Sequence, residues 1–279
     1  MEMQPMNNHR LLSVFTLAAA TAAFVPATAQ AYTYYCDAPH YYPVNSCQST
    51  PNDVDELVGE TLTELDSDGW SGSWYEGQDA WPQDFIDNSL VGYSDGLDYL
   101  YADNANLALF AGHGNNARIF YGYPHDEGLG ARCDAGGPQT PNGLALGASA
   151  GHQVAIAIFA SCCTLNPNTL QYMYANNGAN QILGFGSDAK IESGMLHEFY
   201  EDTQDTANVE SWLDRMEDRP GWGTGDNSTV ALQVGNDADN AAWLASFCMI
   251  RADRCNVNFG PGPYHYWGWW RNHGTGLCP

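Results

Sequence analysis

The sequence predicts an α/β fold built on a mainly parallel sheet with helices on both faces. Three apolar runs, at residues 107–112, 154–160 and 181–186, lack polar alternation, as expected of strands that are covered on both faces. Residues 168–176, between the second and third runs, carry apolar side chains at helical spacing. This strand, helix, strand order is typical of parallel sheets.

Amphipathic helices are expected on either side of this central set. In residues 53–65 the apolar side chains recur at helical spacing with acidic side chains between them. Residues 192–202 and 207–218 follow the same pattern, and residues 229–234 predict a late strand. The sheet should therefore have enough helices to cover it.

The N-terminus has the layout of a secretory signal peptide. Arg10 precedes an apolar stretch at 11–25, and residues 29–31 (Ala-Gln-Ala) form a small-x-small cleavage site. The apolar stretch is short for a membrane span, and no second stretch of about twenty apolar residues follows it. We expect a signal peptide at 1–31, a secreted, extracellular or periplasmic location, and no stable membrane insertion.

Residues 32–279 are expected to form a single domain, because their number suits one core and no Pro- or Ser-rich linker divides them. Residues 32–51 predict an irregular N-terminal segment. Residues 115–151 predict a long, glycine-rich loop, with a covering helix at 145–150 as the alternative for part of it. The aromatic-rich segment at 264–270 is expected to tie the chain end to the domain, with glycan binding as the alternative.

The composition is strongly acidic, with 33 acidic and nine basic residues and a formal net charge of −24. This charge disfavours nucleic acid and anionic membranes as partners. It suits a solvated surface, or the attraction of cationic substrates. The acidic runs at 66–69 and 236–240 resemble fragments of calcium loops, but neither has the twelve-residue pattern, so turns are expected. No HExxH or comparable ligand spacing is present, and no metal or cofactor is predicted.

Eight cysteines in an exported chain indicate disulfide-stabilised loops. The spacing suggests three bridges: Cys36 with Cys47, Cys248 with Cys255, and Cys133 with Cys278. Cys162 and Cys163 would then remain, since adjacent cysteines rarely bridge to each other.

Two of the apolar runs end in side chains that can carry catalysis. His113 follows the run at 107–112, and Cys162 and Cys163 follow the run at 154–160. If the two strands are parallel neighbours, the imidazole and a thiol reach the same sheet edge. In open α/β sheets that edge, beyond the carboxyl ends of the strands, is where ligands bind.

Nucleophilic cysteine catalysis needs a thiolate, an imidazole that accepts and returns the proton, and N–H groups that hold an oxyanion. We predict Cys162 or Cys163 as the nucleophile and His113 as the general acid and base. Gly114, which has no side chain to obstruct a carbonyl oxygen, would offer its N–H to the oxyanion.

A strand ending in His-Gly, followed some fifty residues later by a strand ending in a small residue and Cys, resembles the caspase, legumain and gingipain group of cysteine peptidases. The resemblance covers residues 107–188. It implies a caspase-like sheet, with His113 and Gly114 in the catalytic positions and Cys162 as the favoured nucleophile. It also implies that Ser187 and Asp188 end the next strand, near the pocket for the substrate side chain before the scissile bond (P1). The chain looks closest to an uncharacterised family of secreted bacterial proteins within or beside that group.

The sequence thus predicts a secreted cysteine peptidase-like hydrolase that acts on peptides or proteins through a Cys-His dyad and needs no cofactor. Asp188 would accept a basic P1 side chain, or would instead cap the following helix. The alternative function is a catalytically silent member of the same fold that binds protein or cell-wall glycan outside the cell.

Overall fold

A computed structural model describes twelve stretches of the chain: residues 32–40, 42, 54–89, 94–115, 117–125, 132–136, 143–144, 146–147, 154–165, 178–217, 227–251 and 265–270. The expected signal peptide at 1–31 and the expected helix at 168–176 lie outside these residues. Within them, no helix is both long and apolar enough to cross a bilayer.

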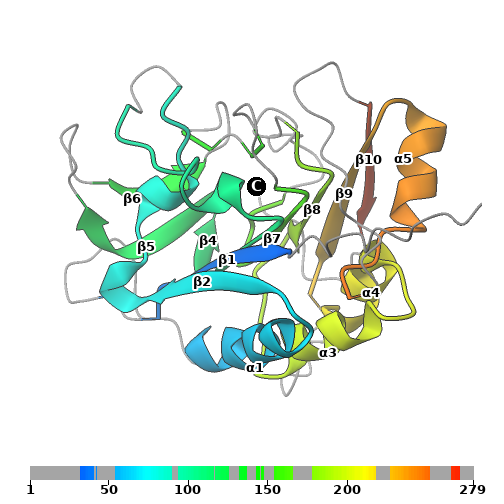
Figure 1. Ribbon diagram of the computed structural model, residues 1–279, viewed down its shortest axis with the longest axis horizontal. Coiled ribbons are helices and arrows are strands. Elements are labelled where there is room, and N and C mark those ends of the chain that lie inside the picture. Colours follow the sequence, from blue (N-terminus) through cyan, green and yellow to red (C-terminus); the bar gives the residue numbers. More distant parts are fainter. Residues whose placement is uncertain are drawn as a thin grey trace, which may run out of the picture. The chain divides into compact units, whose positions relative to one another are not determined.

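A seven-stranded sheet forms the centre of the fold, in the order β10-β9-β8-β7-β3-β1-β2 (Figure 1). The strands are β1 (Thr33–Ala38), β2 (Ser71–Glu76), β3 (Leu107–Ala111), β7 (Ile156–Ala160), β8 (Gln181–Phe185), β9 (Thr229–Gly235) and β10 (His265–Trp270). The five strands from β2 to β8 in this order are parallel, whereas β9 pairs antiparallel with both β8 and β10. The predicted α/β class and mainly parallel sheet are confirmed.

Side chains of the central strands alternate between two cores. Leu107, Leu109 and Ala111 of β3 enter one core, and Ala108 and Phe110 enter the other. β7 shows the same alternation, since its even-numbered residues join the first core and its odd-numbered residues join the second. Apolar residues at every position of these strands are therefore required, because both faces are covered.

The α-helices α1 (Val54–Ser67), α3 (Met195–Asp202) and α4 (Asn208–Arg215) cover the first core, with α3 in contact with both others (Figure 1). They confirm the helices expected at 53–65, 192–202 and 207–218. The second core is covered by the 3₁₀ helices η2 (Pro82–Phe85) and η3 (Ala102–Asn104) and by a smaller sheet. A further helix, α5 (Ala238–Ala245), packs on β9 and β10.

Two segments expected to be irregular form strands instead. Residues 33–38 are β1, which lies between β2 and β3, so the prediction of an irregular segment is wrong there. Within residues 115–151, β5 (Arg118–His125) and β6 (Arg132–Gly136) join β4 (His113–Asn115) in a three-stranded antiparallel sheet. A register shift between Phe120 and His125 interrupts the two-residue alternation of β5, which hid this strand from pattern reasoning.

The two acidic runs that resemble calcium-loop fragments lie at helix ends, at the end of α1 and at the start of α5. Asp66 accepts a hydrogen bond from the Tyr34 hydroxyl at 2.9 Å, and Asp68 accepts one from the Tyr200 hydroxyl at 2.9 Å. Asp237 caps α5 by accepting a hydrogen bond from the Asn240 N–H at 2.7 Å. These carboxylates are therefore engaged within the protein.

Candidate functional site at the ends of β3 and β7

The strands that carry the predicted histidine and cysteine are parallel neighbours. β3 and β7 pair in register from Leu107 opposite Ile156 to Ala111 opposite Ala160. His113 and Cys162 each follow the last paired residue of their strand by two positions. The topology therefore brings both residues to the same edge of the sheet.

Gly114 lies directly against the turn that carries the cysteines. A Cβ atom at Gly114 would come within 2.4 Å of the Cys162 carbonyl oxygen and 2.9 Å of the Ser161 hydroxyl oxygen. The N–H of Ala117 donates to the Cys163 carbonyl at 3.0 Å, which joins the same two segments a second time. Glycine at position 114 is thus required by close backbone approach.

Cys162 is present as a thiol and is partly exposed. Its sulfur accepts a hydrogen bond from the Ala189 N–H at 3.3 Å and lies 3.4 Å from the Ala189 carbonyl oxygen, to which the thiol can donate. Ala189 follows β8, so the turn beyond a third strand holds the nucleophile candidate. A donated N–H is the kind of contact that favours a charged sulfur.

Cys163 has a different state and environment. It is disulfide-bonded, it is buried, and its backbone is in the left-handed region at φ 54°. A disulfide sulfur cannot act as a resting nucleophile, so of the two adjacent cysteines only Cys162 offers a thiol for the predicted chemistry. The expectation that both would remain outside disulfides is wrong for Cys163.

Cys36 is a thiol and not part of a disulfide. Cys36 is a fully buried thiol on β1, so the predicted bridge to Cys47 is wrong. Its side chain belongs to the first core, and burial, followed by the charge of Asp37, raises the pKa of the thiol well above its ordinary value. Cys248 is disulfide-bonded, and its predicted partner Cys255 lies outside the described residues.

His113 is half-buried at the start of β4. Its ring meets the ring of Tyr42 edge-on, with 5.2 Å between the centroids. The Tyr42 hydroxyl donates to the Phe120 carbonyl at 2.6 Å, which anchors the tyrosine to β5. Sequence reasoning missed Tyr42, because nothing in its local sequence indicates contact with a residue seventy positions away.

Ser187 and Asp188 occupy different environments beyond β8. Ser187 is fully buried, and its hydroxyl accepts from the Ser228 N–H at 2.9 Å and donates to the Asp188 carbonyl at 3.3 Å. Its side chain thus joins β8 to the start of β9. Asp188 is exposed, and its Oδ1 lies 3.4 Å from the Cys163 sulfur. The alternative role of Asp188 as a helix cap is wrong, because Gly194 precedes α3.

Residues 43–244 match a family model described as a domain of unknown function (DUF6345). The chain belongs to this family. No curated protein matches it. The matched range contains β3, β7 and β8, so the predicted site residues at their ends lie within the DUF6345 domain, whereas Tyr42 lies one residue before it.

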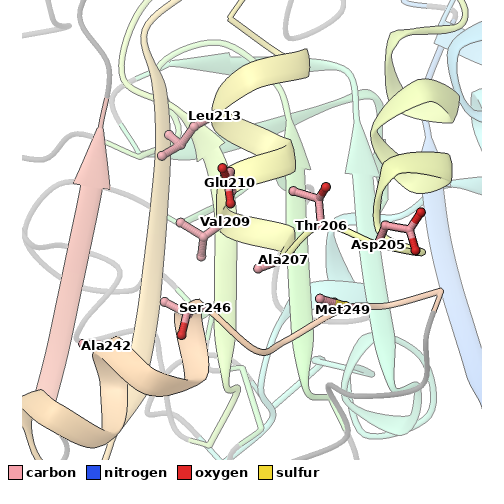
Figure 2. A pocket seen from close by; sticks show the side chains of 10 residues that line it. Asp205, Thr206, Ala207, Val209, Glu210, Leu213, Ala242, Ser246 and Met249 are labelled. Carbon is pink, nitrogen blue, oxygen red and sulfur yellow. The ribbon is translucent and has the colours of Figure 1, made fainter.

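A hollow of about 670 Å³ lies between α4 and the end of α5 (Figure 2). Val209 and Glu210 of α4 and Ser246, just after α5, point into it (Figure 2). The adjacent Asn208 donates to the Gln181 side chain at 2.9 Å, and Gln181 begins β8. The hollow is therefore near the end of the sheet where β8 starts, opposite the cysteine turn.

One group of side chains, on helices α1 and α3, could also hold a metal ion. Ligand atoms of Glu64, His197 and Glu201 all lie within 4.8 Å of one another. Glu64 also forms an ion pair with Arg251 at 2.6 Å, and the nearest approach of His197 Nδ1 to Glu64 is 3.0 Å. Arg251 balances the charge of Glu64, whereas the Glu64 Oε2 and His197 Nδ1 atoms are buried and have no hydrogen-bond partner among the described residues.

Proposed function

We propose that this member of the DUF6345 family is a cysteine peptidase-like hydrolase with a caspase-like arrangement of its site. Cys162 is the nucleophile, His113 is the general acid and base, and the backbone at Gly114 contributes to the oxyanion site. The observation that carries the proposal is the pair of strand ends, because β3 and β7 are adjacent, parallel and in register up to two residues before each candidate. The partly exposed thiol of Cys162 also supports it.

The proposed reaction proceeds through an acyl-enzyme. His113 takes the thiol proton, the Cys162 sulfur forms a bond to the substrate carbonyl carbon, and the negative charge passes to the carbonyl oxygen. The carbon–nitrogen bond then breaks as His113 returns the proton to the leaving amine. Water, deprotonated by His113, attacks the thioester, and the carboxylic acid product leaves while Cys162 regains its proton.

We infer that the substrate is a peptide or protein with a basic P1 residue. Asp188 supports this preference because its exposed side chain adjoins Ala189, whose backbone contacts the Cys162 sulfur. The net charge of −24 would attract cationic segments over a longer range. Export by the N-terminal signal and disulfide-stabilised loops belong to the same proposal.

The test is alkylation by iodoacetamide at neutral pH, followed by peptide mapping under non-reducing conditions. We expect Cys162 to be labelled rapidly and the buried thiol of Cys36 only after denaturation, so that Cys36 serves as an internal reference. His113→Ala should slow the labelling of Cys162 about tenfold or more. His197→Ala is the matched control, because this histidine is also half-buried but lies on α3 beside Glu64.

Cleavage of fluorogenic peptides then tests the reaction. We expect peptides with arginine or lysine at P1 to be cleaved, Cys162→Ser to abolish cleavage, and Asp188→Asn to reduce it selectively for these peptides. If Cys162 resists iodoacetamide until the protein is denatured, the peptidase proposal is refuted. The alternative, a catalytically silent fold that binds protein or cell-wall glycan, would then take its place.

A further inference from the structure

Two helices that pack on each other, α1 and α3, bring three metal-binding side chains together (Figure 1). Glu64 lies in the last turn of α1, and His197 and Glu201 lie one turn apart on α3. Side chains four residues apart share one face of a helix. Within the described part of the chain, this is the one group of three or more histidine, cysteine, aspartate or glutamate side chains whose ligand atoms lie within 4.8 Å of one another.

The distances within this group suit the ligands of one ion. Glu64 Oε2 lies 3.0 Å from His197 Nδ1, and Glu201 Oε1 lies 3.8 Å from His197 Nε2. Bonds of about 2.0–2.2 Å in a tetrahedral zinc site place neighbouring ligand atoms roughly 3.3–3.6 Å apart. Because an ion takes one nitrogen of the ring, the Glu201 carboxylate has to turn towards the nitrogen that Glu64 faces. The Glu201 side chain is 53% exposed, so this rotation needs no repacking of the core.

Two of the ligand atoms lack the partners that buried polar atoms need. Glu64 Oε2 and His197 Nδ1 are buried, and neither forms a hydrogen bond with a described residue. They are 3.0 Å apart, but a proton on Nδ1 would not point at the oxygen closely enough for a hydrogen bond. A buried polar atom without a partner is costly. A metal ion removes this cost for both atoms, because its ligands approach it from different directions and need not point at each other.

Arg251 holds the glutamate of α1 in the orientation that a ligand needs. Its guanidinium lies 2.6 Å from Glu64 Oε1 and 3.1 Å from Asp68 Oδ2. Glu64 therefore uses one oxygen for the arginine and keeps the other for the ion, as in metal sites where an outer partner orients a ligating carboxylate. Glu64, Glu201 and Asp68 carry three negative charges against the single positive charge of Arg251. A divalent cation would balance the remaining charge.

A ligand set of one imidazole and two carboxylates indicates the kind of ion. Zinc is bound by histidine nitrogen and by carboxylate oxygen, and it often has three protein ligands and a water. Calcium and magnesium prefer oxygen ligands alone. We propose that Glu64, His197 and Glu201 bind a zinc ion that links α1 to α3, with water in the fourth position beside the exposed Glu201. The site shares no residue with the proposed Cys-His dyad.

Equilibrium dialysis of the Cys162→Ser protein tests the binding. This background removes a partly exposed thiol that could itself bind zinc. The protein is freed of metal with EDTA and dialysed against ZnCl₂, CaCl₂ or MgCl₂ at matched ionic strength, because salt screens the net charge of −24. We expect a saturable site for zinc, and binding of calcium and magnesium that is at least about tenfold weaker.

Substitution of the ligands should remove this site. His197→Ala should weaken zinc binding at least about tenfold, since loss of an outer partner of a ligand alone costs about 10–100-fold. His40→Ala is the matched control, because Nδ1 of this histidine lies 3.7 Å from a single carboxylate, that of Glu76. Glu201→Gln should weaken zinc binding equally, and it should fold because the side chain is half-exposed. Glu198→Gln is its control, since it removes the same charge from an exposed position on α3.

Thermal unfolding gives a second readout, because an ion that binds only the native state raises the midpoint. At a free zinc concentration about a hundredfold above the Kd, we expect a rise of about 5–10 °C in the Cys162→Ser protein. The rise should be absent when this protein also carries Glu201→Gln and should be retained when it carries Glu198→Gln.

The proposal fails if His197→Ala and Glu201→Gln bind zinc as tightly as the parent protein, or if the three cations bind equally. It also fails if His40→Ala loses zinc and His197→Ala does not. These measurements use a protein without the Cys162 thiol, so their outcome is independent of the peptidase proposal.

Discussion

Asp84→Asn should flatten the pH dependence of stability between about pH 4 and pH 7. Asp84 and Asp37 are buried on either side of Tyr35, whose hydroxyl oxygen lies 2.8 Å from Asp84 Oδ2 and 2.7 Å from Asp37 Oδ1. The Tyr121 hydroxyl adds a bond to Asp37 Oδ2 at 3.1 Å. The single proton of the Tyr35 hydroxyl cannot be donated to both carboxylates at once, so a proton on one carboxyl group completes the network.

The direction of the effect follows from the pKa of Asp84. Burial raises this pKa from the ordinary 3.8 to about 7, although hydrogen bonds from Tyr35 and the Trp81 N–H act against the rise. Burial and the charge of Asp84 likewise raise the pKa of Asp37. The native state thus keeps a proton that the unfolded chain releases near pH 3.8. The stability due to this proton is complete below that pH and is lost as the pH rises to about 7.

The size of the effect follows from the same values. A change in pKa from 3.8 to about 7 corresponds to about 4 kcal/mol of unfolding free energy. Ionisation of Asp84 should therefore cost the wild type stability of this order across the interval. Asp84→Asn keeps an oxygen for Tyr35 and should lose less, and the loss that remains comes from Asp37, whose pKa is also raised.

Urea unfolding followed by tryptophan fluorescence, at several pH values between about 4.5 and 7.5 and at constant ionic strength, measures the difference. Glu60→Gln is the control, since it removes one charge from an exposed position on α1 and should retain the wild-type slope. Equal slopes for Asp84→Asn and the wild type would refute the reasoning, as would a wild type that becomes steadily more stable towards neutral pH.

Three further substitutions test packing and capping by urea unfolding. Gly114→Ala places a methyl group against the Cys162 carbonyl and should lower the free energy of unfolding by about 1–3 kcal/mol. It should also slow the alkylation of Cys162. Unchanged stability would mean that the two segments are not in contact. Trp212→Phe removes the indole bond to the Gly184 carbonyl at 3.1 Å and leaves a void, with an expected loss of about 2–4 kcal/mol, and a loss below about 1 kcal/mol would contradict this. Asp237→Ala removes the cap of α5 and should cost about 1 kcal/mol, whereas Asp237→Asn should retain most of the stability.

Local patterns were sufficient to find the centre of the fold. The apolar runs that became β3, β7 and β8 are buried on both faces, so every position must be apolar and the signal is continuous. Helices α1, α3 and α4 each bury one stripe, which the spacing of their apolar residues reveals. From these elements the sequence could also place His113 and Cys162 at strand ends.

Strands with distant partners could not be found in this way. β1 is recognised by its pairing with β2 and β3, and Tyr35 lies opposite both Ser73 and Ala108. Its own residues, aromatic and polar with one cysteine, fit a loop as well as a strand. β5 and β6 were hidden for a related reason, because a register shift breaks the local alternation by which a strand is recognised.

The sequence by itself determined the α/β class, the central strands, the acidic charge and the short set of residues able to carry cysteine chemistry. Only the tertiary structure decided that Cys163 is disulfide-bonded while Cys162 and Cys36 are thiols, and that Ser187 is buried. The physical reason is that the state of a thiol or carboxyl group depends on its neighbours in space. Those neighbours come from segments far away in the chain, and no local pattern records them.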